Sequence, residues 1–115
     1  MNPDDQLLAR IAERLKALAD PTRLRILHSL ERGELCVTDI LERVGGSQAN
    51  VSKHLAVLRR CGVVASRREG TSVYYRPLDP TAFAICRMVC DTLEEQSARE
   101  HSFLKRARAA AGVRR

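Results

Sequence analysis

The sequence is poor in aromatic residues: its 115 residues include two Phe, two Tyr and no Trp. A hydrophobic core must therefore be built mainly from Leu, Ile, Val and Ala, which suits packed helices. No run of 18 or more apolar residues is present, which excludes a membrane-spanning helix. The first residues, MNPDDQ, carry acids in place of the basic and apolar segments of a secretory signal. We therefore expect a cytoplasmic protein with no membrane partner.

Recognisable enzyme motifs are also missing. The sequence has no nucleophile elbow, P-loop or dinucleotide fingerprint, and its three histidines show no catalytic spacing, so we expect no enzyme. No Cys-x-x-Cys pair is present, which argues against a structural zinc knuckle or a thioredoxin-type motif. Permanent disulfides are not expected either, because the cytoplasm keeps thiols reduced.

Acidic residues are outnumbered. The chain has 14 Asp and Glu against 20 Lys and Arg, which gives a formal net charge of +6. A basic surplus on a small domain favours polyanionic partners, and nucleic acid before all others. The length fits one domain, which we predict over residues 1–115.

Proline and glycine mark the ends of the predicted helices. Asn2-Pro3, Asp20-Pro21 and Asp79-Pro80 each place an N-cap residue before a proline that suits the first helical position. Glycines interrupt the helical pattern where the chain must turn. With the spacing of apolar residues, these signals predict helices over residues 3–18, 21–31, 37–44, 47–60 and 80–109.

The apolar period changes after the fourth predicted helix. Residues 63–68 and 72–76 are β-prone stretches separated by Glu69-Gly70-Thr71, which predicts a β-hairpin with a polar, basic tip. A hairpin directly after a helix-turn-helix is a wing. We therefore predict a mainly α fold with a small β-hairpin, a winged helix-turn-helix of about five helices. A basic tail, from Lys105 to Arg115, is expected to be solvated rather than bound to DNA.

The predicted helix over residues 47–60 has the composition of a recognition helix. Its N-terminal half carries short polar and basic side chains, and this is the part of such a helix that meets base edges. Arginines at its other end and in the wing suit phosphate or minor-groove contacts. His54 suits either a DNA contact or packing against its own domain. The predicted DNA-binding residues are Ser47, Gln48, Asn50, Ser52, Lys53, His54, Arg59, Arg60, Arg67, Arg68 and Thr71.

The chain resembles the ArsR/SmtB family of metal- and stress-sensing repressors in four stretches: ALADPTRLRILHSL, GELCVTDI, SQANVSKHLAVLRRCGVV and REGTSVYYR. The resemblance runs from about Leu15 to Arg76, more than half of the chain. It implies a homodimer whose first and last helices form the interface. It also implies a double-stranded operator of imperfect two-fold symmetry, and release from that DNA when an inducer binds.

Two metal sites known in the resembled family are incomplete here. One uses Cys-x-Cys at the start of the third helix, and the matching positions are Cys36 and Thr38. The other uses two histidines of the last helix, and the matching positions are Thr81 and Thr92. Neither site can therefore bind a metal with its full set of ligands in this sequence.

Cys86 and Cys90 are the candidate inducer ligands, because a spacing of four residues places them on one face of the last helix. Thiolates prefer soft acceptors, such as As(III), Sb(III), Cu(I) or thiophilic divalent ions. A third ligand could come from Cys36, near a helix N-terminus that favours thiolate, or from the partner chain. We predict no obligatory cofactor and a soft metal(loid) ion as inducer. Cys61 suits packing.

Three alternatives remain open from the sequence. The thiols could report oxidants or persulfides, although two thiols one helical turn apart are poorly arranged for a mutual disulfide. The chain could also be an inducer-blind DNA-binding protein whose cysteines only pack. A winged helix that binds protein in place of DNA is the third alternative.

Overall fold

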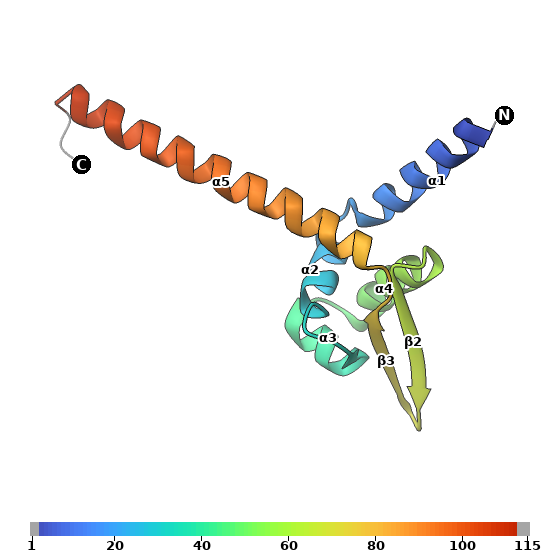
Figure 1. The fold of residues 1–115 in the computed structure, drawn as a ribbon. Helices are drawn as coiled ribbons and strands as arrows, with labels where there is room; N and C mark the ends of the chain where they lie inside the picture. Colours follow the sequence, from blue (N-terminus) through green and yellow to red (C-terminus); the bar gives the residue numbers. More distant parts are fainter. Residues whose placement is uncertain (1–2, 113–115) are drawn as a thin grey trace. The chain divides into compact units, whose positions relative to one another are not determined.

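The structure, a computed structural model, describes residues 3–112. Its elements (Figure 1) are α1 (Pro3–Leu18), α2 (Pro21–Ser29), β1 (Leu35–Cys36), α3 (Val37–Val44), α4 (Gln48–Arg60), β2 (Val64–Glu69), β3 (Ser72–Pro77) and α5 (Pro80–Ala110). The predicted class, mainly α with a winged helix-turn-helix, is confirmed. Contacts divide the described residues into two compact units, one up to Phe83 and one from Ala84 onward. We describe each unit by itself.

The core of the first unit lies where α2, α3 and α4 meet the start of β2. Its fully buried side chains are aliphatic, as the scarcity of aromatic residues requires, and they interlock at the close packing typical of protein interiors. The largest of them are Ile26, Leu30, Ile40, Val51, Leu55, Leu58, Val63 and Val64. No polar or charged residue is buried among the described residues, so the core is apolar throughout.

The sheet has three antiparallel strands in the order β1-β3-β2. Strands β2 and β3 form the predicted hairpin, and Gly70 has a φ of 62° in the two-residue connection, a conformation that glycine adopts without strain. The sequence did not predict β1. It has only two residues, too few to show an alternating pattern, and it is a strand only because Leu35 and Cys36 pair with Tyr75 and Tyr74. We call residues 64–77 the wing.

One predicted boundary was wrong. α2 ends at Ser29 and not at Glu31, because the buried Leu30 closes the helix, and its N–H bonds to carbonyls of the preceding turn. The last helix ends at Ala110, within one residue of the prediction, so Lys105, Arg106 and Arg108 of the basic segment belong to α5. Arg114 and Arg115 lie outside the described residues.

Several large apolar side chains are exposed on each of α1 and α5. On α1 these are Leu7, Leu8, Ile11 and Leu15, which are 44–62% exposed. The part of α5 in the second unit, from Ala84 onward, exposes Met88, Val89, Leu93, Phe103 and Leu104 at 54–68%. Within residues 3–112 no helix combines the length and the hydropathy needed to cross a membrane.

Candidate nucleic-acid interface

The turn between α3 and α4 sets the start of the predicted recognition helix. Gly45 and Gly46 both have positive φ, 82° and 83°, which other residues rarely adopt. Ser47 then caps α4, and its hydroxyl accepts a hydrogen bond from the backbone N–H of Asn50 at 3.1 Å. Such a cap satisfies one of the N–H groups that lack a partner at the start of a helix. The helix-turn-helix predicted from the glycine pair is confirmed.

The two sides of α4 differ sharply in exposure. Val51, Leu55 and Leu58 are buried, while the predicted base-reading residues Ser47, Gln48, Asn50, Ser52 and Lys53 are all exposed. Arg59 and Arg60, at the C-terminal end of the helix, are exposed as well. The first unit therefore presents one face of α4 that can donate and accept hydrogen bonds, which is the arrangement that groove recognition requires.

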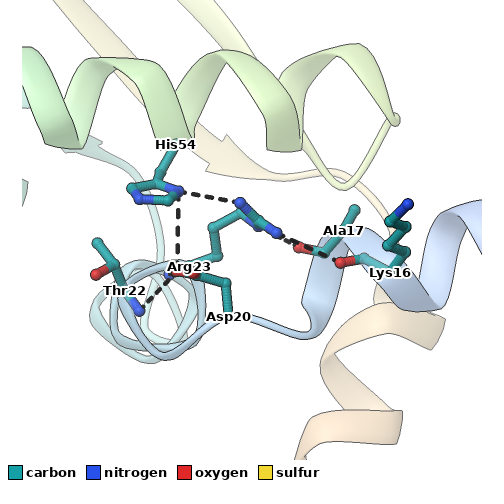
Figure 2. A network of polar contacts seen from close by, with 6 residues as sticks. All are labelled: Lys16, Ala17, Asp20, Thr22, Arg23 and His54. Atoms are coloured by element: carbon teal, nitrogen blue, oxygen red, sulfur yellow. Dashed lines mark hydrogen bonds and ion pairs between the residues drawn. The ribbon is translucent and has the colours of Figure 1, made fainter.

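His54 lies away from this exposed face. Its side chain is only 14% exposed and turns toward the start of α2, as Figure 2 shows. Its Nδ1 lies 3.1 Å from Nη1 of Arg23 and 3.8 Å from Oδ2 of Asp20. Of the two roles that the sequence left open for His54, this geometry favours packing within the domain over DNA contact.

Arg23 extends this group of contacts to α1. Its Nε donates to the carbonyl of Ala17 at 2.6 Å, and its Nη2 donates to the carbonyl of Lys16 at 3.4 Å (Figure 2). Both carbonyls belong to the last turn of α1, where carbonyl groups lack helical partners. We call Asp20, Arg23, His54 and these two carbonyls the junction network. It joins the end of α1 and the start of α2 to the middle of α4.

Asp20 is the acidic member of the junction network and the N-cap of α2. Its carboxylate accepts from the backbone N–H groups of Thr22 at 2.9 Å and Arg23 at 3.1 Å. The hydrogen bond from the backbone N–H of Arg23, helped by the positive charge of the Arg23 guanidinium and by the N–H of Thr22, holds the pKa of Asp20 below its usual value. The carboxylate is therefore charged at neutral pH. The Asp-Pro pair predicted the cap, but it gave no sign that Arg23 and His54 would join it.

The predicted wing residues fall into two groups. Arg68 and Thr71 are exposed toward the end of the hairpin, and within residues 3–112 Arg68 has no ion-pair partner. Arg67 is different, because it pairs with Glu34 and Glu69 and lies over the ring of Tyr74. Glu34 was missed from the sequence, since nothing in its local pattern marks a partner 33 residues away.

The candidate inducer residues are divided between the two units. Cys36 is half-buried in β1 and precedes α3, where its side chain makes no capping hydrogen bond. On α5, Cys86 is half-buried and Cys90 is exposed, with its Sγ 3.7 Å from Oε1 of Glu94. Neither these three nor Cys61 forms a disulfide. Within residues 3–112 no three His, Cys, Asp or Glu side chains gather around a possible metal position.

Comparisons with known proteins agree with this geometry. Residues 20–66, from the cap of α2 into β2, match the family described as "Bacterial regulatory protein, arsR family". The fold is similar to a homodimeric winged helix-turn-helix DNA-binding domain from Mycobacterium bovis, with a TM-score of 0.77, 32% identity, and coverage of 86% of this chain and 92% of that one. The chain belongs to the ArsR family.

Two curated ArsR-family relatives extend the comparison. The chain is 46% identical over 76 residues to the transcriptional regulator NmtR of Mycobacterium tuberculosis, covering 66% of this chain and 63% of NmtR. It is 48% identical over 62 residues to the arsenical resistance operon repressor of Escherichia coli, which covers 53% of each protein. The chain thus spans less than two thirds of the length of these relatives. The proteins that it resembles are transcriptional regulators and not enzymes.

Replacing His54 tests its placement in the junction network. We expect His54→Asn to lower the free energy of unfolding by about 1 kcal/mol, the usual loss for one hydrogen bond, and to leave the salt dependence of DNA binding unchanged. Urea denaturation measures the first effect, and titration of labelled duplex from the protein's own promoter region at several KCl concentrations measures the second.

The adjacent exposed residue provides the matched control. Lys53→Gln should leave the free energy of unfolding unchanged and reduce the slope of log affinity against log salt by about 0.9, the effect of losing one phosphate contact. A reduced salt slope for His54→Asn would contradict the internal placement of His54.

Proposed function

We propose that this chain is a DNA-binding transcriptional repressor that acts as a homodimer and leaves its operator when a soft metal(loid) ion binds its thiols. The observation that carries the DNA-binding part is the exposed polar face of α4, held between the Gly45–Gly46 turn and the wing. The formal net charge of +6 supports a polyanionic partner. Family membership supports the same role.

The contacts are assigned by the chemistry of each exposed side chain. The amides of Gln48 and Asn50 suit paired hydrogen bonds to adenine, and Ser47 and Ser52 suit single ones. Cationic side chains suit phosphates, which contribute affinity without sequence information. We assign base edges to Ser47, Gln48, Asn50 and Ser52, and the DNA backbone to Lys53, Arg59, Arg60, Arg68 and Thr71.

Sequence discrimination tests the proposed base contacts. Gln48→Ala should weaken binding to the operator by about 1–3 kcal/mol, the value of one good bidentate base contact, and should leave binding to a random duplex unchanged. Fluorescence anisotropy with both duplexes at one salt concentration gives the comparison. The control Gln6→Ala, an exposed glutamine of α1 on the side of the helix opposite Leu8 and Leu15, should alter neither affinity. Absence of salt-sensitive binding by the unmodified chain would overturn the proposed function.

The homodimer part of the proposal depends on exposed apolar surface. Apolar side chains on α1 and α5 remain about half exposed or more in the single chain. Contiguous apolar surface of this kind marks interfaces in soluble proteins. The M. bovis domain that this fold resembles is itself described as homodimeric. We propose that both helices contribute to the interface.

A charge placed within the exposed apolar side chains of α5 tests the interface. Leu93 is 58% exposed, and Leu93→Glu should convert the dimer to a monomer, because a carboxylate cannot be buried there without a partner. Sedimentation equilibrium measures the mass. Ala98→Glu adds the same charge about 140° further round the helix, and it should leave the dimer intact. Equal masses for all three proteins would rule out this interface.

The inducer part of the proposal concerns the thiols. Cys86 and Cys90 are one helical turn apart on α5, and two thiolates at this spacing can bind one soft ion such as As(III) or Sb(III). A relative named for arsenical resistance supports this class of ion. Cys36 or a residue of the partner subunit is proposed as the third ligand, since one α5 helix supplies only two thiols.

Operator release tests the thiol site. Arsenite or antimonite should weaken operator binding by the unmodified chain by roughly 5- to 150-fold, the usual range of allosteric coupling. Cys86→Ser and Cys90→Ser should each abolish this release, while Cys61→Ser should keep it. If a persulfide donor releases the DNA and the ions do not, the redox alternative holds. If none of these reagents has an effect, the inducer-blind alternative holds.

A further inference from the structure

The guanidinium of Arg67 is held by two carboxylates. Its Nε and Nη2 donate to both carboxylate oxygens of Glu34, at 2.9 and 2.7 Å, and its Nη1 donates to Oε2 of Glu69 at 2.6 Å. Its central carbon lies 4.6 Å from the centre of the Tyr74 ring. Each of the three guanidinium nitrogens therefore has a partner within the chain. We call Arg67, Glu34, Glu69 and Tyr74 the wing clamp.

The wing clamp spans the width of the sheet. Tyr74 of the central strand pairs with Cys36 of β1 on one side and with Arg67 of β2 on the other. Glu34 immediately precedes β1, so the bond between Arg67 and Glu34 joins the two edge strands across the ring of Tyr74. Because β1 leads directly into α3, this bond also ties the wing to the first helix of the helix-turn-helix.

The partners of Arg67 do not suit a phosphate contact. The wing clamp holds one cation and two carboxylates, and Arg76 is near enough for its charge to act on Glu34 as well. The hydrogen bond from Arg67 holds the pKa of Glu34 below its usual value, so this carboxylate stays charged at neutral pH. A phosphate bound to Arg67 would have to displace a bidentate partner and approach a second carboxylate. Arg68, the next residue, has neither obstacle.

We propose that Arg67 is a positioning residue, which holds the wing against β1 so that Arg68 and Thr71 meet the DNA in a fixed orientation. This inference rests on the proposed DNA-binding function and assigns a different role to the first of the two wing arginines. The planar fork of arginine matches a carboxylate in two places, and lysine cannot reproduce this geometry. Ordering the wing before binding removes an entropic cost from the complex.

Replacing Glu34 distinguishes this role from a phosphate contact, because the two roles predict opposite changes in operator affinity. If Arg67 positions the wing, Glu34→Gln weakens operator binding about 5-fold or more, because the released wing then has to become ordered when the DNA binds. If Arg67 binds phosphate, the same change releases it from a competing carboxylate and tightens binding. Anisotropy titration gives the sign. Tighter binding by Glu34→Gln overturns the proposal.

Substitutions of the two arginines give a second, independent comparison. Arg67→Lys should weaken binding at least as much as Glu34→Gln, because it also disturbs the contacts with Glu69 and Tyr74. The double variant should be no weaker than Arg67→Lys, because the bidentate bond to Glu34 is already lost in that variant. The salt slope should not fall in Arg67→Gln, which removes the positive charge. Arg68→Gln, the matched control, should lower that slope by about 0.9. If Arg67→Lys keeps the affinity of the unmodified chain, the proposal fails.

Amide hydrogen exchange, measured on the protein without DNA, tests the wing clamp independently of the proposed DNA-binding function. Amides of β1, β2 and β3 should exchange faster in Glu34→Gln and Arg67→Lys than in the unmodified chain, and at unchanged rates in Arg68→Gln. Unchanged exchange in all three variants overturns the wing clamp. A chain that binds no DNA would contradict the proposed function, while the exchange measurement would still decide whether the clamp orders the wing.

Discussion

Burial of one side of α4 is the constraint on which the rest of the first unit depends. Val51, Leu55 and Leu58 recur at helical spacing and are at most 1% exposed. Once these three side chains enter the core, the opposite side of the helix, with Ser52, Lys53 and Arg60, has to face outward. The polar face of the helix is therefore a consequence of how the core is packed. Because apolar burial is not directional, it decides which side of α4 turns inward and leaves the angle of the helix less well defined.

Directional bonds fix the relative orientation of the elements, and Arg23 and Arg67 are two of the arginines that make them. In the junction network, Arg23 joins the end of α1 to His54, 31 residues further along the chain. In the wing clamp, Arg67 joins β2 to Glu34 across 33 residues. Both arginines use their fixed fork of donors to connect elements that the hydrophobic core alone would leave free to tilt. A basic residue in a DNA-binding protein can thus have an internal task.

This division of tasks changes how the positive charge of the chain should be interpreted. Arg23 and Arg67 each have partners inside the first unit, whereas Arg59, Arg60 and Arg68 are exposed and have no ion-pair partner within residues 3–112. A cation that is already paired within the chain is less available to displace the counterions of DNA, so the net charge overstates the number of phosphate contacts. For α5, the apolar side chains and the two thiols lie on one long helix, so dimerisation and inducer binding are proposed for the same element.

Local patterns were enough to predict most of the elements. The Asp-Pro pairs, the Gly45–Gly46 turn and the spacing of Val51, Leu55 and Leu58 act over a few residues, and the helices and hairpin that they predicted are present. Capping, glycine conformation and amphipathic periodicity are properties of neighbouring residues, which explains why a single sequence displays them.

What needed the tertiary structure is the pairing of distant side chains. β1 is a strand only because it pairs with β3. Nothing in the sequence indicated that His54 and Arg67 have side-chain partners within residues 3–112 while their neighbours Lys53 and Arg68 do not. In a helix or strand, the side chains of consecutive residues point in different directions. Only the packed fold shows which of these side chains lies next to a carboxylate. Sequence determined which segments form the helix-turn-helix and wing. The fold decided which of their cations are left for DNA.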